Sequence, residues 1–304
     1  MEQTPSKFAP RYWPSWLLVG LMWLLARLPI RVGTGLTGLL APLMSGLMKS
    51  RKRIAAINIK ACFPELDASQ QAALVDQCFR SLARALGEMA YCWAGSRAKV
   101  IRSGEVEGLE HLEAARQGGR GVLVVTCHMT CLDIGGRIFA ENIDNENFSA
   151  VYRPLKNPVL EWFQNRGRGR FTHSMISKRE SRSAIRHLRN GGMLWYAPDQ
   201  DFGPEQSSLV PFFGIQTATL SATHRLAKLG NAVVVPMFPR RLANGRYRAT
   251  VLPAIEGVPS EDRVADLTRI NQVTEEFIRQ APDQYWWVHR RFKTRPPGEL
   301  PFYR

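Results

Sequence analysis

This sequence of 304 residues has fewer acidic than basic residues, no CxxC pair of cysteines and few long apolar runs. Each of these features narrows the class of protein to which it can belong. The 26 aspartates and glutamates face 41 lysines and arginines, giving a net charge of +15. That surplus favours an anionic partner: nucleic acid, a membrane surface, or a substrate rich in phosphate and carboxylate. The five cysteines include no CxxC pair, so we expect reduced thiols and no structural zinc site. A hydrophobic content of 45% excludes disorder as the default.

Two common catalytic motifs are absent, and a third lacks its context. Neither the P-loop pattern nor the GxSxG motif occurs, which weakens the interpretations as a nucleoside triphosphatase or a serine hydrolase. Gly33, Gly35 and Gly38 match the GxGxxG pattern, but no strand is expected before them and no acidic residue near position 55 could hold a ribose. A glycine-rich amphipathic or membrane helix explains these glycines better.

The amino-terminal region is apolar, although its first run is short for a membrane span. The sequence WPSWLLVGLMWLLA at 13–26 falls below the ~20 residues that a spanning helix needs. A second apolar stretch, 32–48, ends in a basic cluster. Tryptophans settle at the lipid headgroup level, and an anionic leaflet attracts basic residues by about 1 kcal/mol each. We expect residues 1–50 to form a helical membrane anchor, spanning or interfacial; the alternative is a pair of buried helices in a soluble domain.

The rest of the chain divides into a helical part and an alternating part. Residues 51–99 are expected to be helical and membrane-proximal, with an interruption at 63–66 and Ser69 as a possible helix cap. Residues 100–304 alternate between β-rich and helical runs, which predicts an α/β domain with a largely parallel central sheet covered by helices. The expected strands are 122–126, 149–153, 193–197, 232–238 and 247–252. The expected helices are 132–141, 158–166, 179–190, 217–229 and 264–280.

The segment GVLVVTCHMTCLDIGGR at 121–137 combines a strand, a histidine and a carboxylate. His128 follows the strand and Asp133 lies in the first turn of the expected helix, an HxxxxD spacing. Residues at the carboxyl ends of parallel strands face the crevice where α/β proteins bind ligands. A carboxylate that holds one imidazole nitrogen leaves the other free to accept a proton from a hydroxyl. The alternative is a core histidine beside a capping aspartate.

Three further polar clusters follow expected strands or helices. Arg153 ends a strand, and Arg168 and Arg170 belong to the GRGR sequence that ends a helix. Asp199 and Asp201 follow another strand within PDQDFGP. Arginine suits bidentate binding of phosphate or carboxylate. Solvated helix ends and ordinary turn chemistry are the alternatives for these clusters.

The order of the motifs resembles the lipid A late acyltransferases, the lauroyl/myristoyl transferase family within the lysophospholipid acyltransferase superfamily. The HxxxxD element is typical of the superfamily, whereas PDQDFGP together with WVHRRFKTRPPG is far more specific. The matching segments are PRYWPSW, NIKACFPEL, GVLVVTCHMTCLD, VYRPLKNPVLEWFQNRGRGR, MLWYAPDQDFGP, VPFFG, VVPMFPRR and DQYWWVHRRFKTRPPGE.

The resemblance implies a glycerolipid acyltransferase-like fold and transfer of a fatty acyl group from acyl carrier protein. The acceptor would be the 3-hydroxyl of an acyl chain on a Kdo-bearing lipid A precursor. His128 would be the general base and Asp133 would fix its tautomer, while Arg168 and Asp199 would complete the site. The residues that would bind substrate are Arg153, Arg168, Arg170, Asp199 and Asp201. No metal or cofactor is implied, and the expected location is the cytoplasmic face of the bacterial inner membrane.

Other interpretations stay open on the sequence. The DxD at 199–201 could hold a metal and a nucleotide sugar in a glycosyltransferase. A basic module that binds anionic lipid or RNA without catalysis, or an acyltransferase with another lipid acceptor, is also possible. The segments 210–214 and 217–219 are candidates for an acyl slot. The basic patch is expected to include Arg240, Arg241 and the basic residues of 289–295.

Overall fold

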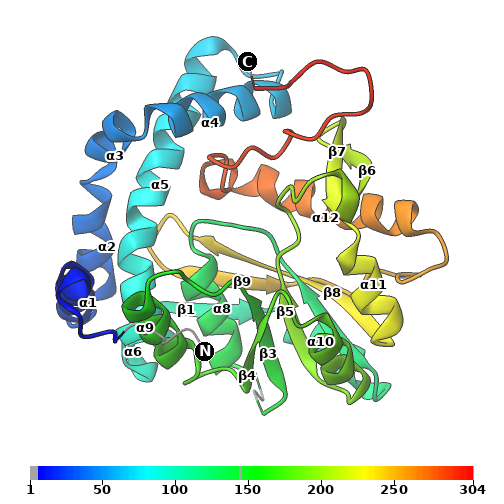
Figure 1. Ribbon diagram of the computed structural model, residues 1–304, viewed down its shortest axis with the longest axis horizontal. Coiled ribbons are helices and arrows are strands. Elements are labelled where there is room, and N and C mark those ends of the chain that lie inside the picture. The colour runs from blue at the N-terminus through cyan, green and yellow to red at the C-terminus, as the bar shows by residue number, and fades with distance from the viewer. Residues whose placement is uncertain (1–5, 144–145, 304) are drawn as a thin grey trace.

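The computed structural model describes residues 6–143 and 146–303, and a seven-stranded sheet forms its centre (Figure 1). Neighbouring strands are parallel, apart from the antiparallel pair β8 and β9. The α/β class and the largely parallel sheet are therefore confirmed. In spatial order the strands are β1 (Gly104–Glu107), β9 (Tyr247–Val251), β8 (Ala232–Arg241), β2 (Gly121–Val125), β5 (Met193–Tyr196), β3 (Phe148–Tyr152) and β4 (Ser174–Ser177).

Helices cover both faces of the sheet. The strand β2 is therefore buried on both sides, which is why its residues are almost all apolar. Val122 and Val124 pack into one core cluster with side chains of α7 (Leu109–Gln117), α8 (Leu132–Glu141) and α9 (Pro158–Arg168). Leu123 and Val125 alternate to the opposite face, against α10 (Ser181–Arg189) and α11 (Ala222–Leu229). A strand buried on both faces has no solvent side to mark with polar residues.

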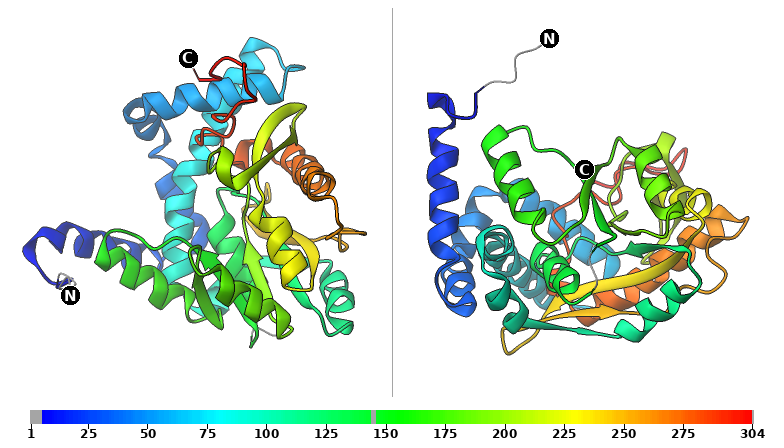
Figure 2. Two further views of the ribbon diagram at one scale, coloured as in Figure 1. Left: turned by 45° about the vertical axis from the view of Figure 1, so that its right-hand side comes forward. Right: turned by 90° about the horizontal axis from the view of Figure 1, so that it is seen from below.

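The amino-terminal helices lie along one long helix, away from α10 and α11 (Figures 1 and 2). A short turn, η1 (Pro10–Tyr12), leads into α1 (Trp13–Leu25), α2 (Ile30–Gly38) and α3 (Ala41–Leu47), which all contact α5 (Ala68–Ala94). The GxGxxG glycines are helical as expected, and Gly33 lies against Tyr91 of α5. The Tyr91 hydroxyl donates to the Leu25 carbonyl oxygen at 2.8 Å, which fixes the α1–α2 connection. Across the described residues, no helix has both the length and the hydropathy to cross a membrane.

Several boundaries differ from the expected ones. Helix α4 (Lys49–Cys62) precedes α5, whose N-cap is Asp67 in a reciprocal capping box with Gln70 rather than Ser69. The expected helix 217–229 begins only at Ala222, because the residues before it form the hairpin of β6 (Ser207–Phe212) and β7 (Ile215–Leu220). The remaining elements are α6 (Arg97–Ser103), η2 (Pro204–Gln206), α12 (Arg263–Gln280) and η3 (Pro282–Gln284).

The chain after α12 returns across the molecule and fastens α4 to the β6–β7 hairpin (Figure 1). Asn58 of α4 donates to the carbonyl oxygens of Trp287 and His289, at 2.7 and 2.8 Å. Arg291 donates to the Ala218 carbonyl oxygen of β7 at 2.6 Å. The hairpin itself turns at Phe213 and Gly214, both with positive φ, which is typical of tight hairpins.

Candidate active site

The register of two neighbouring strands brings His128 and Asp199 together. Strands β2 and β5 are parallel, and Val125 lies opposite Tyr196 at their carboxyl ends. His128 and Asp199 each come three residues after these partners. The Thr126 amide donates to the Tyr196 carbonyl oxygen at 2.9 Å, so the two strands are still paired where the loops begin. The sheet therefore delivers both side chains to one edge.

Asp199 holds His128 through both of its carboxylate oxygens. The His128 Nδ1 lies 2.5 Å from Oδ1, and the His128 backbone amide donates to Oδ2 at 2.9 Å. Asp199 is buried, whereas the His128 side chain keeps 29% of its surface exposed. With Nδ1 bound to the carboxylate, Nε2 is the nitrogen left to face the cleft that His128 lines.

The electrostatics of the pair keep a negative carboxylate beside the imidazole. Burial lowers the pKa of His128, but the charge and hydrogen bond of Asp199, together with the charge of Asp133, outweigh it and raise the pKa above 6.5. Burial alone would raise the pKa of Asp199; its contacts with His128 and the charge of Arg291 instead lower it to about 2. Asp199 is therefore ionised at neutral pH, and His128 is a stronger base than a free imidazole.

Asp133 does not hold His128, which corrects the pairing expected from the HxxxxD spacing. In the first turn of α8, Asp133 accepts from Arg168 at the end of α9, with Nε at 3.2 Å and Nη2 as a second donor to the same oxygen. A guanidinium offers a full positive charge and several N–H donors, so it competes successfully for the carboxylate. The charge of Asp133 still contributes to the raised pKa of His128.

A cleft of about 600 Å³ opens in front of His128. Arg153 and Arg168, both predicted to contact substrate, line this cleft. Apolar residues such as Leu132 and Leu226 line it as well, which gives it the mixed character of a site for an amphiphile. Further basic residues of the lining are Lys178, Arg179 and Arg225.

Three residues predicted to bind substrate lie outside the cleft lining, and one of them, Asp199, holds His128 instead. Arg170 donates to the Trp93 carbonyl oxygen and so joins the end of α9 to α5. Asp201 is 4% exposed, and its carboxylate accepts from the Gly203 amide and from the amide and hydroxyl of Thr294, each at 2.9 Å. Asp201 thus fastens the loop after β5 to the carboxyl-terminal segment.

The two aspartates of the DxD sequence at 199–201 accept hydrogen bonds from different residues. Both oxygens of Asp199 accept from His128, and both oxygens of Asp201 accept from Gly203 or Thr294. Paired carboxylates of a metal-dependent glycosyltransferase need free oxygens for the ion. This arrangement disfavours the glycosyltransferase interpretation.

The carboxyl-terminal segment, which the sequence did not assign to the site, fixes the loop that carries His128. The Trp286 amide donates to the His128 carbonyl oxygen at 3.0 Å, and the Thr130 amide donates to the Gln284 carbonyl oxygen at 2.7 Å. Met129 and Tyr285 form an antiparallel bridge between these two contacts. The motif DQYWWVH marks this segment in the sequence, but its partner loop is about 150 residues away in the chain.

His289, three residues beyond Trp286, holds the loop that carries Asp199. The Asp201 amide donates to its Nε2 at 3.1 Å. Burial and the charges of Arg291 and His128 lower the pKa of His289 to about 4, although the nearby aspartates oppose them. A neutral imidazole fits its part as an acceptor in this contact.

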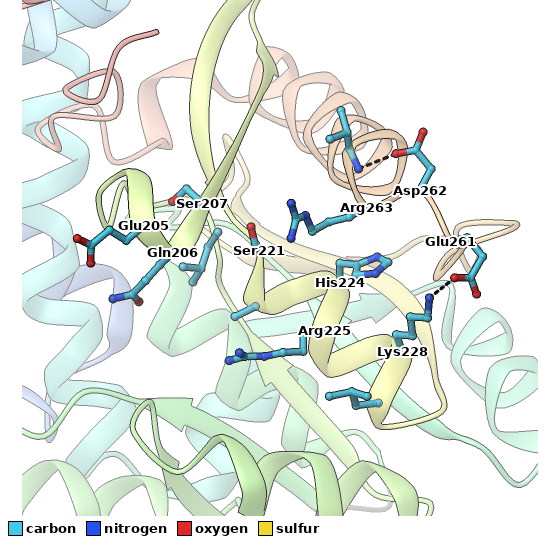
Figure 3. Close-up of a pocket in the computed structure, with 14 residues that line it drawn as sticks. Glu205, Gln206, Ser207, Ser221, His224, Arg225, Lys228, Glu261, Asp262 and Arg263 are labelled. Atoms are coloured by element: carbon cyan, nitrogen blue, oxygen red, sulfur yellow. Dashed lines mark hydrogen bonds and ion pairs between the residues drawn. The ribbon is translucent and has the colours of Figure 1, made fainter. Parts of the chain in front are cut away.

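A second cavity, of about 1160 Å³, adjoins the cleft (Figure 3). It shares Gln206, Leu220, Ala222 and Arg225 with the cleft lining. His224 of α11 lines this cavity. Its Nδ1 lies 2.9 Å from a carboxylate oxygen of the buried Asp266 in α12.

The expected basic patch is wrong at two of its residues, although Arg290 and Lys293 are exposed as expected, and the expected acyl slot is corrected. Arg241 is buried against Glu88 of α5 at 2.7 Å and Arg291 is 1% exposed, so neither belongs to a surface patch. Arg241 and Arg291 were expected on the protein surface because the sequence shows their charge but not their buried partners. Segments 210–214 and 217–219 form the β6–β7 hairpin and lie outside the cleft lining.

Comparison with known proteins identifies the family of this chain through its sequence. The model of the bacterial lipid A biosynthesis acyltransferase family matches residues 1–294. The chain is 38% identical over 295 residues to the lipid A biosynthesis lauroyltransferase of Escherichia coli K12, covering 95% of this chain and 94% of that one. It is 32% identical over 299 residues to the lipid A biosynthesis myristoyltransferase of the same organism, covering 97% and 91%. The 1-acyl-sn-glycerophosphate acyltransferase PlsC of Thermotoga maritima aligns with a TM-score of 0.39 and 15% identity, covering 83% of this chain and 98% of that one. On the family match and these identities, the chain belongs to the bacterial lipid A biosynthesis acyltransferases.

Proposed function

We propose that this enzyme transfers a fatty acyl group from acyl carrier protein to the 3-hydroxyl of an acyl chain on a Kdo-bearing lipid A precursor. The observation that carries the proposal is the His128–Asp199 pair at the mouth of a partly apolar cleft, in a chain of the lipid A acyltransferase family. A base near a hydroxyl and a slot for a fatty chain are what ester formation from a thioester requires.

In this mechanism His128 is the general base. Its Nε2 accepts the proton of the acceptor hydroxyl while that oxygen attacks the thioester carbonyl carbon, and the imidazolium then returns the proton to the departing thiolate. Asp199 orients the imidazole through Nδ1 and stabilises its charged form. A positioned general base contributes roughly 10²–10⁴-fold to a rate.

Asp133 and Arg168 act together rather than through His128. Their ion pair joins the start of α8 to the end of α9 at the cleft, with 21% and 19% of the side chains exposed. Asp133 therefore positions Arg168, whose remaining N–H groups are available to an anionic or carbonyl oxygen of the substrate. Arg153, exposed at the cleft, suits a phosphate of the acceptor.

The partners of such a reaction are all anionic. The acceptor carries phosphates and Kdo carboxylates, and acyl carrier protein is acidic, so a chain of net charge +15 attracts each of them. Arg225 and Arg263 line the second cavity beside the cleft and give a docking carrier protein basic side chains next to the site (Figure 3).

Attachment to the cytoplasmic face of the inner membrane belongs to the same proposal. Of the 22 large hydrophobic side chains that the described residues expose, 14 lie between Phe8 and Leu47. An exposed apolar area of this kind is typical of a surface that meets lipid or another protein. The α1–α3 region therefore supports interfacial anchoring.

The test is reconstitution of the purified enzyme with acyl-acyl carrier protein and a Kdo-bearing lipid A precursor, followed by mass spectrometry of the product. We expect one additional acyl group in ester linkage to an acyl-chain hydroxyl, and the same group missing from lipid A of cells that lack the gene. Acylation of a glycerophospholipid instead, with no change in lipid A, would overturn the acceptor assignment.

A further inference from the structure

Three residues that line the cleft each carry a buried polar side-chain atom with no hydrogen-bond partner among the described residues. The atoms are Thr126 Oγ1, Gln164 Nε2 and Trp195 Nε1. Thr126 and Gln164 are 1% and 5% exposed. Buried polar groups in native proteins are nearly always paired, because an unpaired one loses its contact with water and gains nothing in return. Three such atoms, all in residues that line one cleft, point to a ligand that would pair with them.

The fold gathers these three atoms on one face of the sheet. Trp195 of β5 lies opposite Val124 of β2, and Thr126 continues β2 two residues further, so both side chains share the face of Val124. Gln164 comes from α9, the helix that covers this face, one turn before Arg168. The same cleft exposes His128.

The donors are held in place by their surroundings. A Cβ atom on Gly136 of α8 would lie 2.3 Å from Cη2 of Trp195, so the glycine allows the indole to pack directly on the helix backbone. The Thr126 amide is fixed by its bond to the Tyr196 carbonyl oxygen. Thr126 and Trp195 therefore lie on firmly placed backbone, so a small side-chain movement that admits a ligand would leave their donors in a position to stabilise a developing negative charge.

We propose that Gln164 and Trp195, with the Thr126 hydroxyl, bind a carbonyl oxygen of a fatty acyl chain in the cleft. An amide N–H and an indole N–H can only donate, so the ligand must supply an acceptor. A carbonyl oxygen is the acceptor that an acyl chain brings into a partly apolar slot. This inference rests on the proposed function, and the carbonyl belongs either to the thioester being transferred or to an acyl chain already on the acceptor.

The test uses substitutions that keep shape and remove the polar atom: Thr126→Val, Gln164→Met and Trp195→Phe. Since each removed atom has no partner among the residues that the structure describes, we expect thermal stability to stay unchanged or to rise. We expect kcat/KM to fall about tenfold or more for each variant, the effect of losing a substrate hydrogen bond. Trp93→Phe and Thr250→Val are matched controls, because these side chains also carry buried unpartnered atoms but lie outside the cleft.

Two further measurements identify the source of the carbonyl. Slower hydrolysis of the acyl-carrier thioester without acceptor would assign the donors to the transferred group. Unchanged hydrolysis with a raised KM for the acceptor would assign them to the acceptor chain. Wild-type kcat/KM in all three variants would overturn the inference, whereas a wild-type enzyme that transfers no acyl group would refute the proposed function itself.

Discussion

His128 and Asp199 stand at equal distances beyond two register-matched residues of neighbouring parallel strands, and each oxygen of the carboxylate contacts a different nitrogen of the same histidine. The backbone contact sets where His128 lies, and the ring contact sets which nitrogen is free. Position and protonation are therefore both controlled by one residue.

Removing either member of this pair should stop acyl transfer without unfolding the enzyme. We expect His128→Ala to lower kcat by roughly 10²–10⁴-fold or more, and Asp199→Asn by at least roughly 10²-fold, because a general base and its orientation are lost. Membrane association and the thermal transition of His128→Ala should stay close to wild type. Near-normal turnover by folded His128→Ala protein would refute the mechanism.

The pH profile should report the Asp199 charge. Because the pKa of His128 is raised above 6.5, kcat/KM of the wild type should increase with pH until the imidazole is neutral. Asp199→Asn removes the charge that stabilises the imidazolium, so the acid limb should move to lower pH even as the maximal rate falls. Asp76→Asn, at an exposed pair with Lys52, is the control and should leave the limb in place. An unmoved limb in Asp199→Asn would mean that another group titrates.

The Asp133–Arg168 pair should behave as one unit in activity and contribute little to stability. We expect Arg168→Met and Asp133→Asn each to lower kcat/KM by roughly 10–100-fold, and the double variant to lose no more than the worse single one. Since both side chains are partly exposed, the free energy of unfolding should change by less than about 1 kcal/mol. Additive losses in the double variant would show that the two residues act separately.

Breaking the buried Glu88–Arg241 pair should destabilise the enzyme strongly. Arg241 donates to both carboxylate oxygens, at 2.7 and 2.9 Å, and the Tyr247 hydroxyl adds a third contact at 2.8 Å. Glu88→Ala leaves an unpaired buried guanidinium, so we expect about 3–5 kcal/mol of destabilisation in chemical denaturation. Glu65→Ala, which breaks the exposed pair with Arg279, should cost less than about 1 kcal/mol. Equal losses of unfolding free energy in Glu88→Ala and Glu65→Ala would show that burial does not set the cost of breaking these ion pairs.

Exposed leucines of the α1–α3 region should determine vesicle binding. Leu39 and Leu47 are 76% and 77% exposed, and burying a leucine side chain in lipid contributes about 1.5–3 kcal/mol. We expect Leu39→Ser with Leu47→Ser to weaken co-sedimentation with anionic vesicles at least about tenfold. Leu300→Ser, at a site 68% exposed and far along the chain, should bind as the wild type does. Unchanged binding by the double variant would exclude this surface as the anchor.

The sequence predicted a helix or strand correctly where the residues of that segment alone determine its conformation. The apolar runs of β2 and β8, the amphipathic α12 and the helical GxGxxG segment all follow from residue order and composition. The short strands β1 and β4, four residues each, and the β6–β7 hairpin were missed, because neighbours rather than their own composition decide their conformation.

Within the site, the sequence by itself determined which side chains reach the carboxyl edge of the sheet: His128 after one strand and Asp199 after another. Only the tertiary structure decided that these two pair, that Asp133 turns to Arg168, and that Asp201 fastens the carboxyl-terminal segment. The reason is physical. Spacing along the chain limits which residues can meet within one helix or strand. Partners across a sheet depend on strand order and on competition among charges, and the sequence of a single segment specifies neither.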